Sequence, residues 1–315
     1  MEYRLWDYEA DNCLIESFLL SSSMAHGISQ KDESWFNWKY RDCPDGRSLL
    51  MCAFDGDNVV GCVAMRIGRI YVDGQHRRYG ASYENFVHPA YQGRGIFVRL
   101  IECIEAVCKE EGLEFLICFP NSNSLAGYLK AGWLPQKVMR SKIKLIAPLR
   151  VLKNISSLGK CFQVKHSRAD VVLLSKKQLL LDSKSRISPI WSKEYLRWRF
   201  GVKYTADNCY VDNADFFAIA RVGYRGALKE CQIITVMTYG AYPRQRAFAD
   251  FVKYIEQKEA PDIVSCSYSM YSDFSVFTRR FITVPTKINF VYKVIKKGSV
   301  LPGNIAMDAM FFHTY

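Results

Sequence analysis

The chain has 315 residues and is 49% hydrophobic, 14% aromatic and 23% charged, an ordinary globular composition whose length suits two domains of about 150 residues each. Its formal net charge is +12, and the whole surplus lies after residue 150, because residues 1–150 hold 18 basic and 18 acidic side chains. No apolar run is long enough to span a membrane, and Cys13–Leu20, which is short, contains Glu16 and lacks a basic leader, is excluded as a signal peptide.

The basic second half favours an anionic partner: a nucleotide-linked substrate, a nucleic acid or an acidic surface. The alternative is a solvated surface that only aids solubility. Because the basic residues are dispersed rather than gathered into a run, nucleic acid is disfavoured. Eleven cysteines without a Cys-x-x-Cys pair or a His cluster favour reduced, mostly buried thiols in a cytoplasmic protein, and we predict no metal site.

In chain order, the first 70 residues predict a strand, a helix capped by Ala10-Asp11, an aromatic helical turn and a hairpin with an Asp-Gly turn. These elements are Tyr3–Trp6, Cys13–Leu20, Trp35–Tyr40, and the strands Ser48–Phe54 and Val59–Ile67. The polar stretch Arg69–Tyr79 predicts a loop or a ragged strand.

A strand, a glycine turn and a helix come next. The strand Tyr83–His88 stops at Pro89, the chain turns through Gln92-Gly93-Arg94-Gly95, and a helix with apolar residues at 3–4 spacing runs to Glu111. Glycines between a strand and a helix leave backbone N–H groups pointing outward at the helix N-terminus. Such an arrangement holds a phosphate or pyrophosphate.

The remainder of the first half predicts a buried strand, a loop that caps a second helix, that helix, and a last strand before a connector at Pro148. They are Glu114–Phe119, Pro120–Ser124, Leu125–Ala131 and Lys142–Ile146.

This order of elements and two separated motifs resemble the GNAT superfamily of acetyl-CoA-dependent N-acetyltransferases. His88–Ile96 matches the acyl-CoA motif, a Gln or Arg followed by two variable residues, Gly, a variable residue, and Gly or Ala. Asn121–Trp133 matches a later motif, in which an Asn precedes a Tyr by seven residues and an aromatic follows five residues on. One departure is Phe97, where the family usually has Gly or Ala; it either alters the path of the pantetheine arm or packs under it.

The resemblance implies acetyl-CoA as the co-substrate. The strand at Phe86-Val87 would part from Leu116–Phe119, pantetheine would lie in the gap, and the Val87 N–H would polarise the thioester carbonyl. Asn121 and Ser124 would bind the pantetheine arm or its phosphate. The backbone N–H groups that would hold the pyrophosphate, with Arg94 adding charge, are those of Gln92, Gly93, Arg94, Gly95, Ile96 and Phe97.

The resemblance also implies catalytic roles. Tyr128 would protonate the departing thiolate, and Glu84, directly or through a water, would take the proton of the amine, with His88 as the second candidate. Simpler interpretations remain for each residue: a surface ion pair for Glu84, a structural residue before proline for His88, and a core residue for Tyr128. For Asn121 the alternative is a plain helix cap.

The second half repeats the layout of the first. Tyr3–Asp11 aligns with Phe162–Asp170 at an offset of 159, and Trp35–Tyr40 aligns with Tyr195–Phe200 at an offset of 160. Two matches at nearly equal spacing predict a tandem α/β protein with domains at residues 1–147 and 148–315. Each domain would be a mixed, mainly antiparallel sheet with a central splay, flanked by helices.

The catalytic motifs do not repeat, because Tyr239–Arg246 has one glycine and a proline, and Ser272–Phe281 lacks the Asn and Tyr pair. We therefore predict a degenerate second domain that shapes or binds the acceptor.

The predicted function is transfer of acetyl from acetyl-CoA to a primary amine of a small, anionic acceptor. The first acceptor class is an amino sugar, nucleotide-linked or free, in surface-polysaccharide biosynthesis. The alternatives are acetylation of a protein or of a small amine such as a polyamine or aminoglycoside, and a non-catalytic module that binds acyl-CoA. The oligomeric state stays open.

Overall fold

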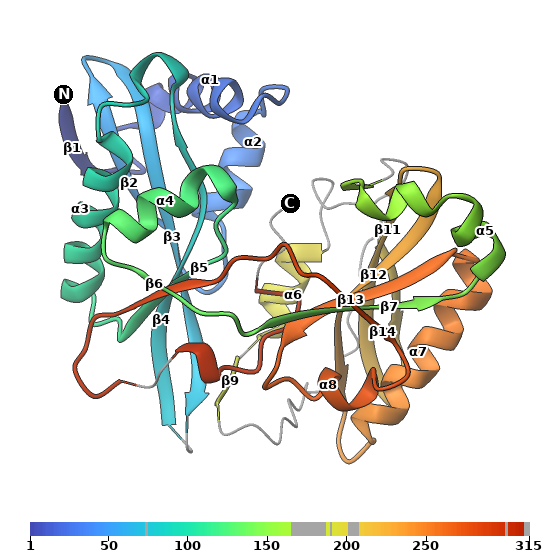
Figure 1. The fold of residues 1–315 in the computed structure, drawn as a ribbon. Helices are drawn as coiled ribbons and strands as arrows, with labels where there is room; N and C mark the ends of the chain where they lie inside the picture. Colours follow the sequence, from blue (N-terminus) through green and yellow to red (C-terminus); the bar gives the residue numbers. More distant parts are fainter. Residues whose placement is uncertain (73–74, 165–186, 190, 201–207, 300–301, 312–315) are drawn as a thin grey trace. The chain divides into compact units, whose positions relative to one another are not determined.

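The computed structural model describes residues 1–72, 75–164, 187–189, 191–200, 208–299 and 302–311 (Figure 1). These residues form two compact units that are interleaved along the chain. Unit 1 contains Met1–Lys137 and Ile288–Asn304, and unit 2 contains Val138–Lys287 and the segment that begins at Ile305. Up to residue 311, the last that the structure describes, the chain passes from one unit to the other three times, whereas the predicted division had a single crossing after residue 147.

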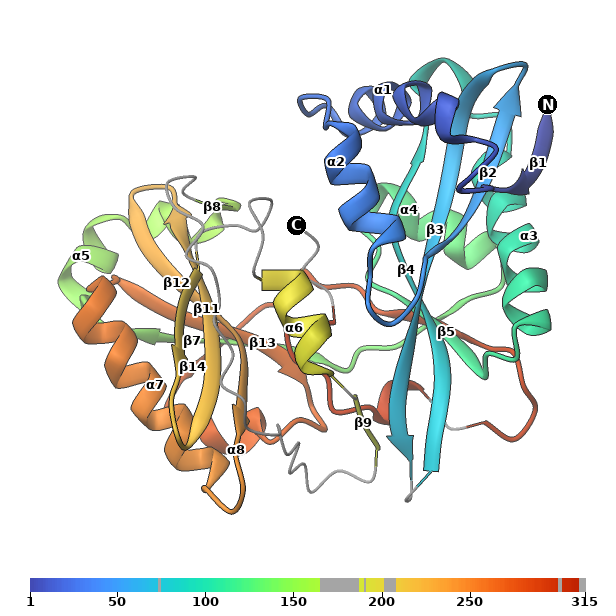
Figure 2. The same cartoon turned by 180° about the vertical axis from the view of Figure 1, so that it is seen from behind.

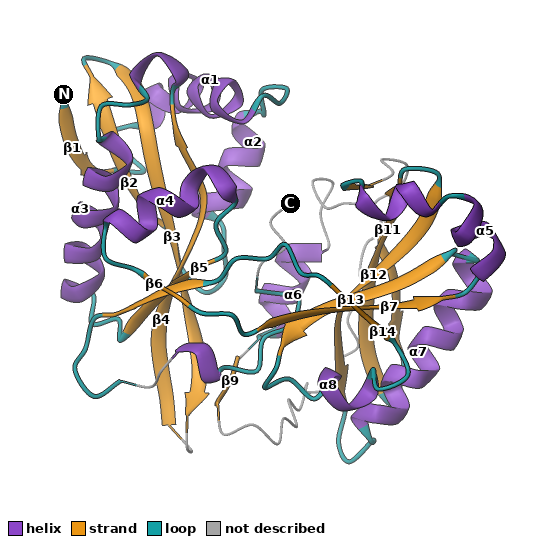
Figure 3. Cartoon of the chain, in the orientation of Figure 1, coloured by secondary structure: helices purple, strands orange, loops and turns teal. Residues whose placement is uncertain are grey.

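Unit 1 is built on one mixed sheet (Figure 3). Its neighbouring strands run antiparallel except β4 and β5, which are parallel. The order across the sheet is β1 (Glu2–Leu5), β2 (Leu49–Asp55), β3 (Asn58–Val72), β4 (Gln75–Val87), β5 (Phe115–Cys118), β15 (Val291–Val294) and β6 (Leu134–Pro135). The polar stretch Arg69–Tyr79 thus continues β3 and opens β4, which fits the ragged-strand alternative better than a loop.

Helices cover both faces of this sheet (Figures 1 and 2). They are α1 (Ile15–His26), α2 (Glu33–Phe36) with a π-helical turn over Asn37–Arg41, α3 (Ile96–Glu110) and α4 (Ser122–Lys130). Successive residues of β2 serve opposite faces because side chains alternate along a strand. Met51 and Ala53 join a buried cluster with α3, whereas Phe54 packs in an aromatic cluster with Trp6.

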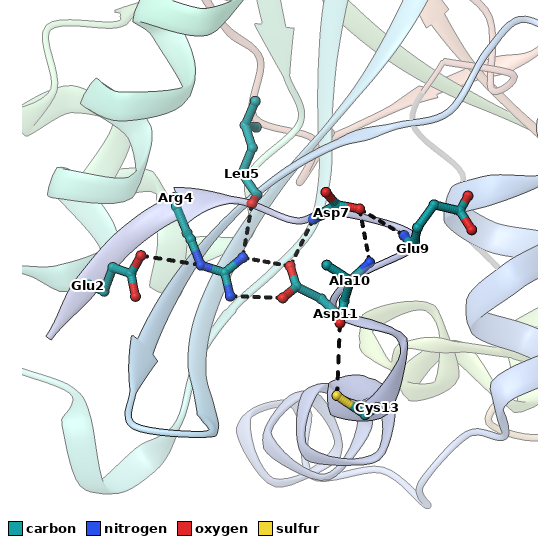
Figure 4. Close-up of polar contacts among 8 residues, drawn as sticks. All are labelled: Glu2, Arg4, Leu5, Asp7, Glu9, Ala10, Asp11 and Cys13. Atoms are coloured by element: carbon teal, nitrogen blue, oxygen red, sulfur yellow. Dashed lines mark hydrogen bonds and ion pairs between the residues drawn. The ribbon is translucent and has the colours of Figure 1, made fainter.

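The N-terminal strand is tied to the residues that follow it (Figure 4). Both guanidinium nitrogens Nη1 and Nη2 of Arg4 donate to the Asp11 carboxylate, at 2.6 and 2.8 Å, and the Asp7 N–H donates to the same carboxylate at 2.8 Å. Burial raises the pKa of Asp11, but the bonds from Arg4 and Asp7 outweigh it, and the net direction is a lowered pKa. Asp11 precedes the 3-10 turn Asn12–Leu14, yet its side chain makes no capping bond, so the predicted cap is wrong.

Unit 2 has a second mixed sheet in the order β10 (Asn208–Asp212), β11 (Phe216–Arg225), β12 (Leu228–Thr238), β13 (Ile263–Ser269), β7 (Met139–Leu145) and β14 (Ile282–Val284), with β8 (Phe162–Val164) paired to β11. Here too a single parallel pair, β12 with β13, interrupts antiparallel neighbours. Its other elements are α5 (Pro148–Lys153), a 3-10 turn over Ile155–Gly159, β9 (Ile187–Pro189), α6 (Lys193–Phe200), α7 (Arg244–Glu259) and α8 (Phe274–Phe277). A further 3-10 turn over Pro302–Asn304 belongs to unit 1. The proposed match of Tyr3–Asp11 falls partly on residues 165–170, which lie outside the described residues.

The two sheets exchange one strand each. β7 follows unit 1 elements in sequence but lies between β13 and β14 of the second sheet. β15, close to the C-terminal end, takes the corresponding place between β5 and β6 of the first sheet. The strand predicted at Lys142–Ile146 therefore exists, but it does not close the first domain as expected. A hydrophobic pattern specifies a strand and not the sheet that it joins, so the exchange left no signal in the sequence.

All eleven cysteines are free thiols, and only Cys13 and Cys161 are exposed, as predicted. Among the described residues, none of the helices combines the length and the apolar character needed to cross a bilayer.

Candidate active site

Strands β4 and β5 part within unit 1. Their ladder ends at the pair Ser82 and Cys118, while β4 continues to Val87 with only β3 beside it. The His88 N–H donates to the Val60 carbonyl of β3 at 2.8 Å. Because N–H groups alternate in direction along a strand, the Val87 N–H points the other way, into the gap. The predicted oxyanion donor is thus at the open edge of the splay.

A bulge in β4 sets the orientation of the residues in the gap. Cys62 pairs with Phe86 and Ala64 with Tyr83, so two residues of β4 face one of β3. Glu84 lies in this bulge with φ of 49°, in the left-handed region that non-glycine residues rarely adopt. Strained backbone of this kind costs about 1–3 kcal/mol and gathers at functional sites.

The glycine turn leads into α3 as predicted. Gly93 and Gly95 have φ of 77° and 76°, and a Cβ at either would meet no atom within 4 Å, so glycine is needed there for conformation rather than for space. α3 begins at Ile96, and the first four N–H groups of a helix lack intrahelical partners. The turn therefore offers a row of donors at the positive end of a fifteen-residue helix.

Three side chains predicted to lie at this phosphate-binding turn instead make contacts within the protein. Arg94 donates to the Ala90 carbonyl at 3.1 Å and lies over the Tyr91 ring. Gln92 Nε2 donates to the Val87 carbonyl at 3.0 Å, which closes the turn onto the end of β4. Ile96 is buried in the core below. These residues would therefore contribute to a phosphate site through their backbone N–H groups, as expected. The Arg94 side chain is exposed beside the glycine turn.

Phe97 packs under the site. Its ring lies against Gly127 of α4, where a Cβ would approach the Phe97 ring to 2.3 Å. The same ring makes an edge contact with Tyr128 at a centroid distance of 5.5 Å. The large Phe97 in α3 is thus matched by Gly127 in α4, which has no side chain. This geometry fits the alternative in which Phe97 packs beneath the pantetheine arm. Phe86 is also a core residue, because its ring is buried and lies against Phe18.

Asn121 caps α4. Its Oδ1 accepts from the N–H groups of Asn123 and Ser124 and from the Ser124 hydroxyl, at 3.0, 3.0 and 3.1 Å. The residue before it is fixed from the C-terminal part of unit 1, because Asn289 Nδ2 donates to the Pro120 carbonyl at 3.1 Å. The helix-cap interpretation therefore describes Asn121 Oδ1. Residue Asn121 as a whole is exposed just beyond β5, and Ser124 is half-buried.

Tyr128 is at the floor of the splay. Its hydroxyl is fully buried and lies 2.7 Å from both the Ser82 hydroxyl and Asn85 Nδ2. Burial is the main reason that the pKa of Tyr128 is well above its ordinary value. Burial also raises the pKa of the adjacent Cys118 thiol to about 12, so Cys118 is a neutral neighbour. The phenol stays protonated, which is the state that a general acid needs.

Ser82 and Asn85 were not among the predicted residues. Asn85 Oδ1 also accepts from the Ala64 N–H at 3.0 Å, so the bulge itself aims this amide at Tyr128. The available signal was the presence of two further polar residues beside Glu84, in the strand that leads to the glycine turn.

Glu84 forms an ion pair with a lysine that sequence reasoning overlooked. Lys39 Nζ is 3.1 Å from Glu84 Oε1, and the two side chains are only 6% and 17% exposed. Lys39 belongs to the π-helical turn, a geometry that is frequent at functional sites. Its ammonium lies 5.5–5.7 Å from the ring centres of Trp35, Trp38 and Tyr83. A surface salt bridge does not describe this pair, because both partners are largely buried.

Tyr83 forms a second link between β4 and the π-helical turn. Its hydroxyl donates to the Lys39 carbonyl at 3.2 Å and lies 2.6 Å from the Ser48 hydroxyl. The neighbouring Tyr40 hydroxyl is buried and has no hydrogen-bond partner among the described residues. Burial, with the charge of Glu84 adding to it, raises the pKa of Tyr40. Glu84 is thus held at one end of the splay by a rigid aromatic turn.

His88 has a structural role in this geometry. Its Nδ1 accepts from the Ala90 N–H at 3.2 Å and caps the 3-10 turn Pro89–Tyr91. An Nδ1 that accepts leaves the proton on Nε2, so His88 has no free lone pair to act as a base in this arrangement. Of the two predicted bases, the geometry favours Glu84.

Comparison with known proteins agrees with this arrangement. The model of the acetyltransferase (GNAT) family matches residues 14–133, which span the bulge, the glycine turn and Tyr128. Among curated proteins, none matches the chain.

Solved structures share the fold across both units. A GCN5-related N-acetyltransferase from Anabaena variabilis is 12% identical with a TM-score of 0.57, and the match covers 94% of this chain and 73% of that one. A probable N-acyltransferase from Enterococcus faecalis is 10% identical with a TM-score of 0.60 and the same coverage. Eis1 from Mycobacterium abscessus is 10% identical with a TM-score of 0.58, covering 93% and 73%. These likenesses concern the fold, and they confirm the predicted tandem arrangement.

Proposed function

We propose, from the match of the acetyltransferase (GNAT) family model to residues 14–133, that unit 1 transfers acetyl from acetyl-CoA to the amine of a small anionic acceptor, an amino sugar being the first candidate. The observation that supports transfer over simple binding is the pairing of a buried acid, Tyr128, with a fixed carboxylate, Glu84, on either side of one gap.

The gap between β4 and β5 would take the pantetheine arm. The Val87 N–H would donate to the thioester oxygen, whose negative charge grows as the amine attacks, a contact worth about 3 kcal/mol in comparable enzymes. The N–H groups from Gly93 to Phe97 would hold the pyrophosphate at the α3 N-terminus.

Two proton transfers complete the reaction. The acceptor would attack as its neutral amine, and Glu84 would take, through a water, the proton that the nitrogen loses as the amide bond forms and the C–S bond breaks, since Lys39 already occupies one of its carboxylate oxygens. Tyr128 would give its proton to the departing CoA thiolate, and the hydrogen bonds of Ser82 and Asn85 would stabilise the phenolate that forms. No step requires a metal in this scheme.

The class of acceptor rests on two weaker observations. The sequence resemblance favours amino sugars of surface polysaccharides, and the positive surplus of residues 151–315 favours an anionic acceptor such as a nucleotide-linked sugar. Polyamines, which are cationic, are the opposing class. Thiol release from acetyl-CoA, measured with a UDP-linked amino sugar, free glucosamine and spermidine in parallel, separates these classes.

The first test is binding of acetyl-CoA by calorimetry to the wild type and to Gly95→Trp. A bulky residue at a φ of 76° would displace the donor row, and we expect binding to be lost. Gly112→Trp is the matched control, because Gly112 has φ of 73°, also meets no atom within 4 Å, and lies at the other end of α3. A wild-type protein that does not bind acetyl-CoA would count against a cofactor site in unit 1. So would equal losses of acetyl-CoA affinity in the two variants.

A further inference from the structure

The second sheet parts in the same way as the first. β12 and β13 end their parallel ladder at Ile233 and Cys266, as β4 and β5 end theirs at Ser82 and Cys118. Three residues past the last ladder position, the first unit has Asn121 and the second has Ser269. The second unit therefore contains a counterpart of the gap that we assign to pantetheine in unit 1.

A segment of the chain itself lies at this gap. The Ser269 N–H donates to the Met307 carbonyl at 2.8 Å, and the Met307 N–H donates to the Ser269 hydroxyl at 2.9 Å. That hydroxyl donates to the Ile305 carbonyl at 2.7 Å. Three hydrogen bonds on Ser269, one through its backbone and two through its hydroxyl, dock the segment at the end of β13.

The segment is also fixed to β12. The Thr235 hydroxyl donates to Asp308 Oδ2 at 2.6 Å, and Asp308 Oδ1 accepts from the Met310 N–H at 3.1 Å. Residues 307 and 308 thus bridge the two strands beyond the point where their own ladder stops. Arg199 of α6 completes the attachment by donating from Nη1 to the Met310 carbonyl at 2.5 Å.

The segment is buried like core. Its exposed fractions are 0% for Ile305, Met307 and Met310, 1% for Ala309 and 7% for Asp308 and Phe311. Phe311 meets the Trp191 ring edge-on at a centroid distance of 5.4 Å. Burial raises the pKa of Asp308, opposed by the Thr235 hydrogen bond and by the charge of Arg244. An acidic residue is kept at this depth only because it has partners.

We propose that the gap between β12 and β13 is a peptide-binding groove whose ligand is an apolar segment with one carboxylate, and that the chain's own Ile305–Phe311 fills it. The segment takes the place that pantetheine takes in unit 1, so unit 2 has no room for acyl-CoA and each chain binds one molecule. The comparison with pantetheine rests on the proposed function, whereas the groove and its occupant do not.

Hydrogen exchange on the full chain tests the attachment without removing any segment. We expect the amides of residues 305–311 to be strongly protected in the wild type and to exchange at least tenfold faster in Thr235→Val, which keeps the shape and removes the donor to Asp308. Thr238→Val is the matched control, because Thr238 lies on the same strand, is 1% exposed, and has a hydroxyl without a partner among the described residues. Wild-type exchange at the rate of a free peptide, or equal exchange in the two variants, overturns the proposal.

A second measurement tests the groove as a binding site. In full-length Met307→Arg the internal segment should leave the groove, and a fluorescent peptide with the sequence of residues 304–311 should then bind in trans, while the wild type should not take it up. The same peptide with alanine in place of the aspartate should bind at least tenfold more weakly. Absence of binding to a folded Met307→Arg protein contradicts the proposal, and if this variant does not fold, the exchange experiment still decides.

Calorimetry then distinguishes this inference from the proposed function. One acetyl-CoA per chain supports both, and two per chain overturns the occupied groove. If no acetyl-CoA binds, the proposed function fails, while the exchange and peptide results still decide whether the groove exists.

Discussion

At the scale of single residues, the site depends on a lysine that no motif contains. Lys39 and Tyr83 connect the π-helical turn to the β4 bulge through an ion pair and a hydrogen bond, so the position of the Glu84 carboxylate is set by residues more than forty positions earlier in the chain. A carboxylate that must act on a bound amine has to be held within a fraction of an ångström, since small misplacements are costly in rate.

We expect Lys39→Met to lower kcat by about 10²-fold while acetyl-CoA affinity stays within a few-fold, because the carboxylate loses its orientation and the cofactor gap is untouched. The decisive readout is a double-mutant cycle with Glu84→Gln. If Lys39 acts through Glu84, Lys39→Met should lower kcat only slightly in the Glu84→Gln background.

Lys39→Arg should recover part of the activity, and Lys109→Met, an exposed lysine at the far end of α3, serves as the neutral control. Additive losses in the cycle would mean that Lys39 acts independently of Glu84.

Tyr128→Phe should lower kcat by about 10²–10⁴-fold, the usual contribution of a positioned acid, and leave acetyl-CoA binding unchanged. It should also cost about 1–3 kcal/mol in the free energy of unfolding, because Ser82 and Asn85 lose a buried partner. Turnover and urea denaturation, measured on the same preparation, separate the two effects. A variant that loses stability but keeps full turnover would identify Tyr128 as a core residue only.

At the scale of elements, α3 and α4 are fitted to each other by one large and one absent side chain. The Phe97 ring occupies the place of a side chain at Gly127 and is confined on its other side by Tyr128. The large side chain of Phe97 and the glycine at position 127 therefore depend on each other.

Gly127→Ala should destabilise the protein by about 1–3 kcal/mol through overpacking against Phe97, although alanine in a helix interior would otherwise add about 1 kcal/mol of stability. In a Phe97→Ala background the same change should be neutral or stabilising, because the space is then free. Chemical denaturation of the four proteins completes the cycle. A Gly127→Ala variant at least as stable as the wild type would show that the Phe97 ring can adopt another position.

The sequence predicted most strands of the first sheet and the turn and cap that flank its gap, because strands, glycine turns and helix caps have local signals. The Gln92–Gly95 turn and the Asn121 cap are examples. It could not predict Lys39, Ser82 or Asn85, whose roles arise only when the β4 bulge and the π-helical turn meet in space. It also could not predict which sheet β7 and β15 would join, since strand pairing over more than a hundred residues has no local pattern.

At the scale of the whole molecule, the exchanged strands make the units dependent on each other's chain segments. β15 pairs with all four residues of β5, and its Lys293 donates to Glu105 of α3 and to the Ala131 carbonyl of α4. The C-terminal part of the chain thus completes the very elements that hold Asn121 and Tyr128.

A chain that ends after residue 147 should therefore fail to fold, because the buried edge of β5 is open and β7 has no sheet to join. Circular dichroism and gel filtration would report an unfolded or aggregated product. Residues 1–137 joined by a flexible linker to residues 288–304 form the matched control, which regains β15 and should fold. A folded 1–147 fragment with a sharp thermal transition would contradict the dependence.

The return of β15 to the first sheet also bears on how the protein is made. Domains usually fold from the N-terminus as they leave the ribosome, but here the sheet of unit 1 lacks β15, the strand between β5 and β6, until residue 294 has emerged. The site-bearing unit would wait, incomplete, through the synthesis of nearly the whole chain. Chains that stop before residue 294 would then lack β15, and we expect them to be inactive.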